Sequence, residues 1–260
     1  MPILWERSGD VGVALIDRPE RRNALDAELC EALRTYLVSE RELRAVVIGG
    51  TGDQAFCAGA DLGRRAADPE GGGLAHGGGD TFRPAFEALL DAIVDHPAPV
   101  IAAVNGAALG AGMQLAVACD LRVVAPHATF GIPAARLGVL LSAANIRRLA
   151  LLCGQATARD VLLTARVLDI DEAERVGLVQ RRAADAVEEA RALANEIAAL
   201  APLSIRGHKY ALNLVAATGE LTDDQVEELA RLEREAFEST DLQEGLAAFA
   251  EKRPPRFTGR

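Results

Sequence analysis

The amino-acid sequence predicts an α/β fold whose C-terminal region is helical. Short segments rich in Val, Ile and Ala alternate with helix-like segments in the first half of the chain, and the last third has the apolar spacing of helices. A chain of 260 residues, 50% hydrophobic and 25% charged, is long enough to bury such a core. We expect a core over residues 1–200 and a helical region over residues 201–260.

The first elements follow the order strand, strand, helix, strand. Residues 4–7 and 11–17 have the pattern of two strands joined by a Ser-Gly-Asp turn. A polar loop follows, a helix begins at Asp26, and residues 45–48 read as a buried strand that ends in glycines. This order favours a right-handed crossover unit.

The remaining elements extend this pattern to the end of the chain. Residues 100–104 and 119–124 are predicted strands, with a helix over residues 110–118 between them. Another helix follows Pro84 and runs to about residue 96, where two prolines end it. From residue 146 onward the chain is mostly helical, with predicted helices at about 157–165, 171–176, 184–200, 202–216, 222–238 and 240–251.

Charge and composition disfavour several classes of function. The net charge is −10, whereas a nucleic-acid binder normally carries a basic surface, so any anionic ligand must meet a local cluster of basic side chains. The four cysteines form no C-x-x-C pair and no metal-ligand cluster stands out, so we expect neither a disulfide framework nor a metal site. The first residues lack a signal-peptide pattern, and no apolar run reaches the roughly 20 residues that span a bilayer. We therefore expect a cytoplasmic protein without membrane insertion.

Two glycine-containing turns are the candidates for chemistry. One is residues 55–62, AFCAGADL, and the other is residues 106–112, GAALGAG; each follows a predicted strand. Taken singly, such a turn is also compatible with close packing of a strand against a helix. Two of them on neighbouring strands can aim two main-chain N–H groups at one point, which is the geometry of an oxyanion hole. The glycine-rich residues 64–80 between them are expected to form either a flexible surface loop or a lid beside a pocket.

Several segments together resemble the crotonase family of enoyl-CoA hydratases and isomerases. They are RPERRNAL, AFCAGADL, PVIAAVNGAALGAGMQLAVACDLRVVAPHATFGIP, RLGV and AAFAEKRPPRF, and they cover nearly the whole chain in the order and spacing of the family. The resemblance implies a spiral of ββα units followed by a helical C-terminal trimerisation region. It also implies a homotrimer or hexamer that takes an acyl-CoA thioester as its ligand, with no tightly bound cofactor.

The resemblance assigns roles to particular positions. It implies that the main-chain N–H groups of Ala60 and Ala111 form the oxyanion hole for the thioester oxygen. The family usually has Gly at the second of these positions, but Ala still supplies an N–H. The positions implied to bind CoA are Arg22, Ala24, Ala58, Asp61, Leu62 and Lys252, the last of them often across a subunit interface.

Two positions depart from the pattern of the hydratases. Those enzymes use two glutamates, and here the matching residues are Gln114 and Ala134. A carboxylate and carboxylic acid pair can activate water and deliver a proton, whereas a glutamine amide only forms hydrogen bonds and an alanine does neither. The resemblance extends to actinobacterial members that lack both glutamates and share the GAG-x-QLA and EKRPP segments.

Few other side chains could replace these acids. Residues 138–149 contain no acid, and their polar members are Ser142, Asn145, Arg147 and Arg148. Asp80 and Glu87 either face the pocket or lie in solvent at the start of a helix, and we expect Arg136 and His127 at the surface. Because Gln114, Ala134 and residues 139–144 are mostly small or apolar, we also expect a dry acyl pocket that suits a long chain.

The sequence leaves three functions open. The first is a protein that binds fatty acyl-CoA or enoyl-CoA thioesters with little or no hydratase activity. The second is an enoyl-CoA hydratase or isomerase of fatty-acid metabolism with relocated acid–base groups. The third is another thioester reaction, such as hydrolysis, that depends mainly on the oxyanion hole. We favour the first because both acids are missing.

Overall fold

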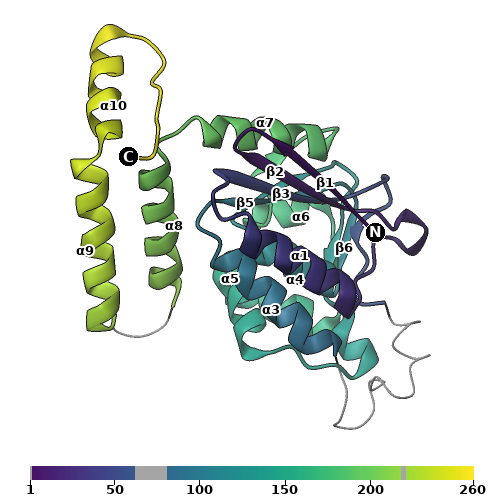
Figure 1. The fold of residues 1–260 in the computed structure, drawn as a ribbon. Coiled ribbons are helices and arrows are strands. Elements are labelled where there is room, and N and C mark those ends of the chain that lie inside the picture. The colour runs from purple at the N-terminus through teal and green to yellow at the C-terminus, as the bar shows by residue number, and fades with distance from the viewer. Residues whose placement is uncertain (1, 62–80, 218–220) are drawn as a thin grey trace.

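The computed structural model describes residues 2–61, 81–217 and 221–260, and Figure 1 shows two sheets flanked by helices. In the larger sheet β1 is antiparallel to β2, and the remaining neighbours are parallel. Its strands, in spatial order, are β1 (Ile3–Ser8), β2 (Val11–Ile16), β3 (Ala45–Gly50), β5 (Val100–Val104), β7 (Leu121–Val124) and β10 (Arg181–Arg182).

The central strands of this sheet are buried on both faces. Every residue of β3 and β5 is buried, as expected for parallel strands with helices on each side. Alternate residues of β3 enter two different cores: Val46 and Ile48 pack with the helices α1 (Ala27–Ser39) and α3 (Phe82–Val94), and Val47 packs beneath α7 (Ala186–Ala198). This alternation is the period of two that a strand imposes on its side chains.

The smaller sheet holds the segments of greatest functional interest. It consists of β4 (Ala55–Cys57), β6 (Ala107–Leu109), β8 (Phe130–Gly131) and β9 (Val167–Leu168), in that spatial order. Around it lie the 3-10 helices η1 (Pro19–Arg21) and η2 (Pro133–Leu137) and the helices α4 (Ala111–Ala118), α5 (Ala143–Thr164) and α6 (Ile170–Arg175). The chain passes from β6 directly into α4, so the second glycine turn is a strand-to-helix junction.

The C-terminal helices stand to one side of this core. They are α8 (Pro202–Ala216), α9 (Asp223–Glu238) and α10 (Thr240–Glu251), drawn from green to yellow in Figure 1. Lys209 of α8 ties them to the core, because its buried Nζ donates to the carbonyl oxygens of Ile93 and Ala98 and lies 2.7 Å from a carboxylate oxygen of Asp120. The division predicted at residue 200 falls between α7 and α8 and stays a prediction.

The element predictions fail in identifiable places. The strands β4 and β6 lie within segments that were expected to be turns, because three residues are too few to display an alternating pattern. The helix expected over residues 157–165 begins already at Ala143, and Gly154, with a φ of 79°, kinks it. The helix expected after Pro84 begins at Phe82, because proline is tolerated in the first turn of a helix.

None of the described helices is both long enough and apolar enough to cross a bilayer. Nor do the described His, Cys, Asp and Glu side chains form a group of three or more suited to a metal ion. A cytoplasmic location stays a prediction.

Candidate functional site

The two glycine turns lie against each other. The strands β4 and β6 pair in parallel, so the residues that follow them leave the sheet side by side. A Cβ placed on Gly59 would lie 3.1 Å from the carbonyl oxygen of Leu109 and 3.7 Å from the nitrogen of Ala111. Gly59 and Gly110 both have positive φ, 114° and 56°, which glycine adopts at little cost. The turns can approach this closely because neither glycine has a side chain.

Each turn presents a main-chain N–H that finds no backbone acceptor in the described part of the chain. Ala60 forms a parallel bridge with Leu25, in which Leu25 N donates to Gly59 O at 2.8 Å and Asp61 N donates to Leu25 O at 2.7 Å. That pattern directs the N–H of Ala60 itself away from Leu25. Ala111 is the first residue of α4, where an N–H has no partner within the helix. Among the described residues, no carbonyl accepts a hydrogen bond from either nitrogen.

Buried charges hold the first turn in place. Arg18, which is 9% exposed, donates to Asp26 at 2.9 Å and to Asp61 at 3.2 Å, and Arg21 donates to the same oxygen of Asp61 at 2.7 Å. Asp26 also caps α1 by accepting from the nitrogen of Leu29. The carboxylate after Ala60 is therefore engaged by two guanidinium groups, which fixes the turn to the start of α1.

The loop before α1 brings two of the predicted CoA-binding positions, Arg22 and Ala24, to a third, Ala58, in this turn. The nitrogen of Ala58 donates to the carbonyl oxygen of Arg22 at 2.9 Å, and Ala24 is buried beside them. Arg22 is exposed, and its backbone has the left-handed conformation, with a φ of 51°. Asn23, 1% exposed, anchors the loop by donating to the carbonyl oxygens of Thr51 and Ala55 at 3.0 and 2.7 Å.

Two of the predicted CoA-binding positions are not found beside the two turns in the described structure. Leu62 lies outside the described residues, as do Asp80 and the possible lid over residues 64–80. Lys252 ends α10, which Figure 1 draws at the upper left, whereas β6 lies at the right. Within one chain, Lys252 therefore does not join the two turns.

Gln114 and Ala134 both lie beside the second turn. Gln114 of α4 donates from Nε2 to the carbonyl oxygen of Gly110 at 3.3 Å and accepts from Asn145 Nδ2 at 3.0 Å. Ala134 lies in η2 and packs against the core; its segment follows Gly131, whose carbonyl oxygen accepts from the nitrogen of Gly110 at 2.8 Å. Both side chains are half-buried and neither ionises.

The other candidate side chains are engaged in local contacts. Glu87 pairs with Arg83 at 3.2 Å, and Ser142 caps α5. Arg136 donates to a main-chain carbonyl oxygen, and exposed His127 lies 2.8 Å from another. None of these four residues forms an acid–base pair in this region of the described structure.

Cys57 is the nucleophilic side chain closest in sequence to Ala60, but burial makes it unreactive. Its thiol is fully buried, and burial raises its pKa to about 12. The thiolate, which is the nucleophilic form, is therefore scarce near neutral pH. The sulfur instead accepts a hydrogen bond from the nitrogen of Gly59 at 3.4 Å and helps to shape the turn.

Comparison with known proteins decides the family. The family model described as "Enoyl-CoA hydratase/isomerase" matches residues 6–260. The chain belongs to this family. It is 40% identical over 261 residues to the "Probable enoyl-CoA hydratase echA6" of Mycobacterium leprae, covering 94% of each chain. It is also 39% identical over 261 residues to the "Probable enoyl-CoA hydratase" of Rhodobacter capsulatus, covering 99% of this chain and 98% of the relative.

Solved structures of the enoyl-CoA hydratase/isomerase family have the same fold. A protein of Magnetospirillum magneticum, described as an "enoyl-CoA hydratase/ carnithine racemase", superposes with a TM-score of 0.88 at 30% identity, covering 100% of this chain and 96% of that chain. An enoyl-CoA hydratase from Bacillus anthracis superposes with a TM-score of 0.85 at 30% identity, covering all of both chains. The predicted crotonase family and its α/β fold class are thus confirmed.

Several residues that shape this site were not predicted from the sequence. Arg18, Arg21 and Asn23 hold the first turn through contacts that only the folded chain creates. Asn145 was noted as polar, but its bond to Gln114 joins positions 31 residues apart. A polar residue among the small apolar residues in the first turn of a helix is the signal that could have indicated such a contact.

Proposed function

We propose that this family member binds acyl-CoA thioesters through the main-chain N–H groups of Ala60 and Ala111. The observation that carries the proposal is the contact between the two turns, each of which presents a donor without a backbone acceptor among residues 2–61, 81–217 and 221–260. Fixed donors of this kind polarise a carbonyl oxygen strongly, and each is worth about 10²–10³-fold in rates of acyl transfer. A thioester carbonyl fits because its oxygen accepts two hydrogen bonds and its chain is apolar.

The loop beside the first turn supports binding of the CoA moiety. In a protein of net charge −10, phosphates require a local cluster of cations. Arg22 is exposed on this loop, and the small residues Ala24 and Ala58 leave room for a ligand against the backbone. We also propose Asp61 and Leu62 as CoA-binding positions, because the resemblance implies them, and Lys252 as a phosphate contact supplied by a neighbouring copy.

We further propose that hydration by this protein is weak or absent. Gln114 and Ala134 occupy the positions where the resemblance implies the two catalytic acids, and neither side chain can transfer a proton. Positioned acid–base groups contribute about 10²–10⁴-fold each to rate. Binding of a thioester needs only the two N–H donors and can persist without those groups.

An enoyl-CoA hydratase or isomerase is the second candidate function. The names of the relatives favour it, because the two similar proteins from Mycobacterium leprae and Rhodobacter capsulatus are each called "Probable enoyl-CoA hydratase". It requires an acid from another position, and Asp80 in the segment outside the description is one such side chain. Hydrolysis of the thioester requires activated water in the same way.

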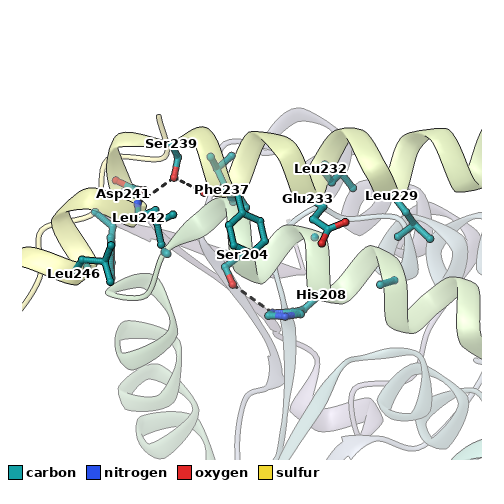
Figure 2. A pocket seen from close by; sticks show the side chains of 17 residues that line it. Ser204, His208, Leu229, Leu232, Glu233, Phe237, Ser239, Asp241, Leu242 and Leu246 are labelled. Atoms are coloured by element: carbon teal, nitrogen blue, oxygen red, sulfur yellow. Dashed lines mark hydrogen bonds between the residues drawn. The ribbon is translucent and has the colours of Figure 1, made fainter. Parts of the chain in front are cut away.

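An apolar groove supports assembly into a homotrimer or hexamer. Leu229, Leu232, Phe237, Leu242 and Leu246 are among the residues that line a cavity of about 640 Å³ among α8, α9 and α10. Figure 2 shows these side chains together with Ser204 and His208 of α8. The Oγ atom of Ser204 lies 3.4 Å from Nδ1 of His208. Phe237 and Leu246 are 66% and 59% exposed, which is unusual for apolar side chains unless a partner covers them. A second copy there would also bring a neighbour's C-terminal helices nearer to the core.

One pair of measurements tests the proposal against the alternative. Crotonyl-CoA is mixed with the purified protein and loss of the conjugated thioester absorbance is followed, while calorimetry measures binding of short-chain and long-chain acyl-CoAs. We expect tight binding of long-chain acyl-CoA without turnover. Rapid hydration would overturn the binding function, and the absence of any binding would overturn the thioester ligand.

A double variant tests the role of the missing acids. Gln114→Glu combined with Ala134→Glu supplies two carboxyl groups at the positions that now lack them. If only these groups are missing, the double variant gains hydration of crotonyl-CoA while each single variant stays inactive. Failure of the correctly folded double variant would show that the pocket lacks further features of a hydratase.

A further inference from the structure

Three side chains form one hydrogen-bonded line that ends at the second glycine turn. Arg148 Nη1 donates to Asn145 Oδ1 at 2.9 Å, and Asn145 Nδ2 donates to Gln114 Oε1 at 3.0 Å. Gln114 Nε2 then donates to the carbonyl oxygen of Gly110 at 3.3 Å. That oxygen belongs to the same peptide group as the N–H of Ala111. The line therefore connects a cation on α5 with one of the two donors of the proposed oxyanion hole.

The groups at the two ends of the hydrogen-bonded line fix the orientation of the side-chain amides of Asn145 and Gln114. A guanidinium only donates, so Asn145 must turn its oxygen toward Arg148 and its nitrogen toward Gln114. A main-chain carbonyl only accepts, so Gln114 must turn its nitrogen toward Gly110 and its oxygen toward Asn145. Reversing either amide would place two donors or two acceptors face to face. Every bond in the line thus points from the cation toward the turn.

The middle of the line is shielded from water, whereas its outer end is not. Asn145 is 6% exposed, and Gln114 is half-buried. Arg148 also pairs with Asp91 at 2.7 Å, but the Asp91 side chain is 63% exposed, so this pair contributes little. Hydrogen bonds between buried groups are stronger than exposed ones and polarise one another. The contacts of Asn145 and Gln114 are therefore the ones that matter.

Two bonds to one carbonyl hold the peptide that carries the donor. The oxygen of Gly110 accepts from the nitrogen of Gln114 at 3.2 Å and from its side-chain Nε2 at 3.3 Å. This peptide is trans, so its N–H points opposite to that oxygen. Gly110 has φ 56° and ψ −113°, a conformation that glycine adopts at little cost, and this conformation sets the direction of the following peptide. A donor bonded to the carbonyl also strengthens the N–H on the other side of the same peptide.

We propose that Asn145 and Arg148 are positioning residues that act through Gln114 to hold and polarise the N–H of Ala111. This inference rests on the proposed function, and it gives Gln114 a definite task. The side-chain amide of Gln114 strengthens the contact between the N–H of Ala111 and the thioester oxygen. The Oε1 atom of Gln114 accepts a hydrogen bond from Asn145.

The test compares two ligands that differ in one oxygen. An acyl-CoA thioester has the carbonyl, and the S-alkyl-CoA thioether of the same chain length lacks it. The ratio of their dissociation constants therefore reports the carbonyl contact and not the pocket as a whole. A second readout is the red shift in absorbance of a conjugated arylacryloyl-CoA, which grows as its carbonyl is polarised.

Asn145→Asp is the sharpest variant. A carboxylate of the same shape still accepts from Arg148 but cannot donate to Gln114. Asn145 is the third residue of α5, where a negative charge favours the helix, so the variant should fold. We expect the preference for the thioester to fall by about threefold to tenfold, the worth of one hydrogen bond. The red shift should shrink with it, while affinity for the thioether stays within about twofold.

Two further variants keep the test decisive. Asp91→Asn changes the exposed end of the line and should leave both readouts unchanged. Gln114→Met removes the side-chain donor at similar volume and should reproduce the effect of Asn145→Asp. If the wild type prefers the thioester and both Asn145→Asp and Gln114→Met retain that preference, the role of the line is overturned and the proposed function stands. If the wild type binds neither ligand, or binds both equally, the proposed function fails and this inference fails with it.

Discussion

Replacing Gly112 by alanine should force the two glycine turns apart. Gly112 is the second residue of α4, and a Cβ there would lie 2.0 Å from the carbonyl oxygen of Cys57 in β4. Such contacts are not seen below 3.0 Å, so α4 and β4 must separate by at least about 1 Å. Overpacking of this kind costs about 3 kcal/mol, which exceeds the roughly 1 kcal/mol that alanine gains over glycine in a helix. We expect net destabilisation by about 2 kcal/mol.

Urea unfolding and calorimetric titration with an acyl-CoA measure the two consequences. Because the clash lies between the turns that carry Ala60 and Ala111, a displacement of about 1 Å should weaken thioester binding by up to about a hundredfold, the worth of two hydrogen bonds. Gly245→Ala is the matched control, since its Cβ would meet Phe257 at an ordinary 3.6 Å. That variant should unfold at the same or a higher urea concentration. If Gly112→Ala behaves like Gly245→Ala in both assays, the reasoning about the turns is wrong.

Three further changes test other parts of the structure. Lys209→Met should lower the free energy of unfolding in urea by about 3 kcal/mol, because the buried ammonium satisfies two carbonyls and a carboxylate; a loss below about 1 kcal/mol would contradict this. The Arg253 guanidinium and the nitrogen of Arg256 lower the pKa of Glu244 from 4.5 to about 2, so this contact stabilises the C-terminal tail above about pH 4.5 and is lost as the pH falls toward 2. The protection factor of the Arg256 amide against hydrogen exchange, which compares its rate with that of an unstructured amide at the same pH, should fall across that window in the wild type and should already be low above it in Glu244→Gln; equal protection factors in the two proteins above pH 4.5 would refute the assignment. Burial raises the pKa of the Cys57 thiol to about 12, and all four cysteines are buried, so a thiol reagent should titrate none in the native protein and four after unfolding.

The central strands of the main sheet could be predicted because they are continuous and buried, whereas the two-residue strand Arg181–Arg182 in the same sheet was not predicted. Segments such as Val100–Val104 are continuous apolar runs bounded by proline or glycine, and the structure places them in the centre of the sheet. The smaller sheet could not be predicted in the same way, since Phe130–Gly131 and its neighbours have two or three residues each. Their pairing depends on tertiary packing and not on local pattern.

The candidate site also has features that the sequence reveals and features that it does not. The turns themselves are visible in the sequence, because glycine and alanine permit the close approach that Gly59 and Gly110 make in the structure. The side chains that hold the turns are not visible, because Arg18 meets Asp61 from 43 positions away. Ion pairs and amide contacts over such separations leave no periodic signal, so they become apparent only once the chain is folded.

A crystal structure of the protein with a bound acyl-CoA tests the central claim most directly. The measured quantities are the distances from the thioester oxygen to the nitrogens of Ala60 and Ala111. We expect both to be about 3 Å, as in a hydrogen bond to an oxyanion-hole donor. A ligand whose carbonyl oxygen lies beyond hydrogen-bond reach of either nitrogen, or points into solvent, would contradict the account.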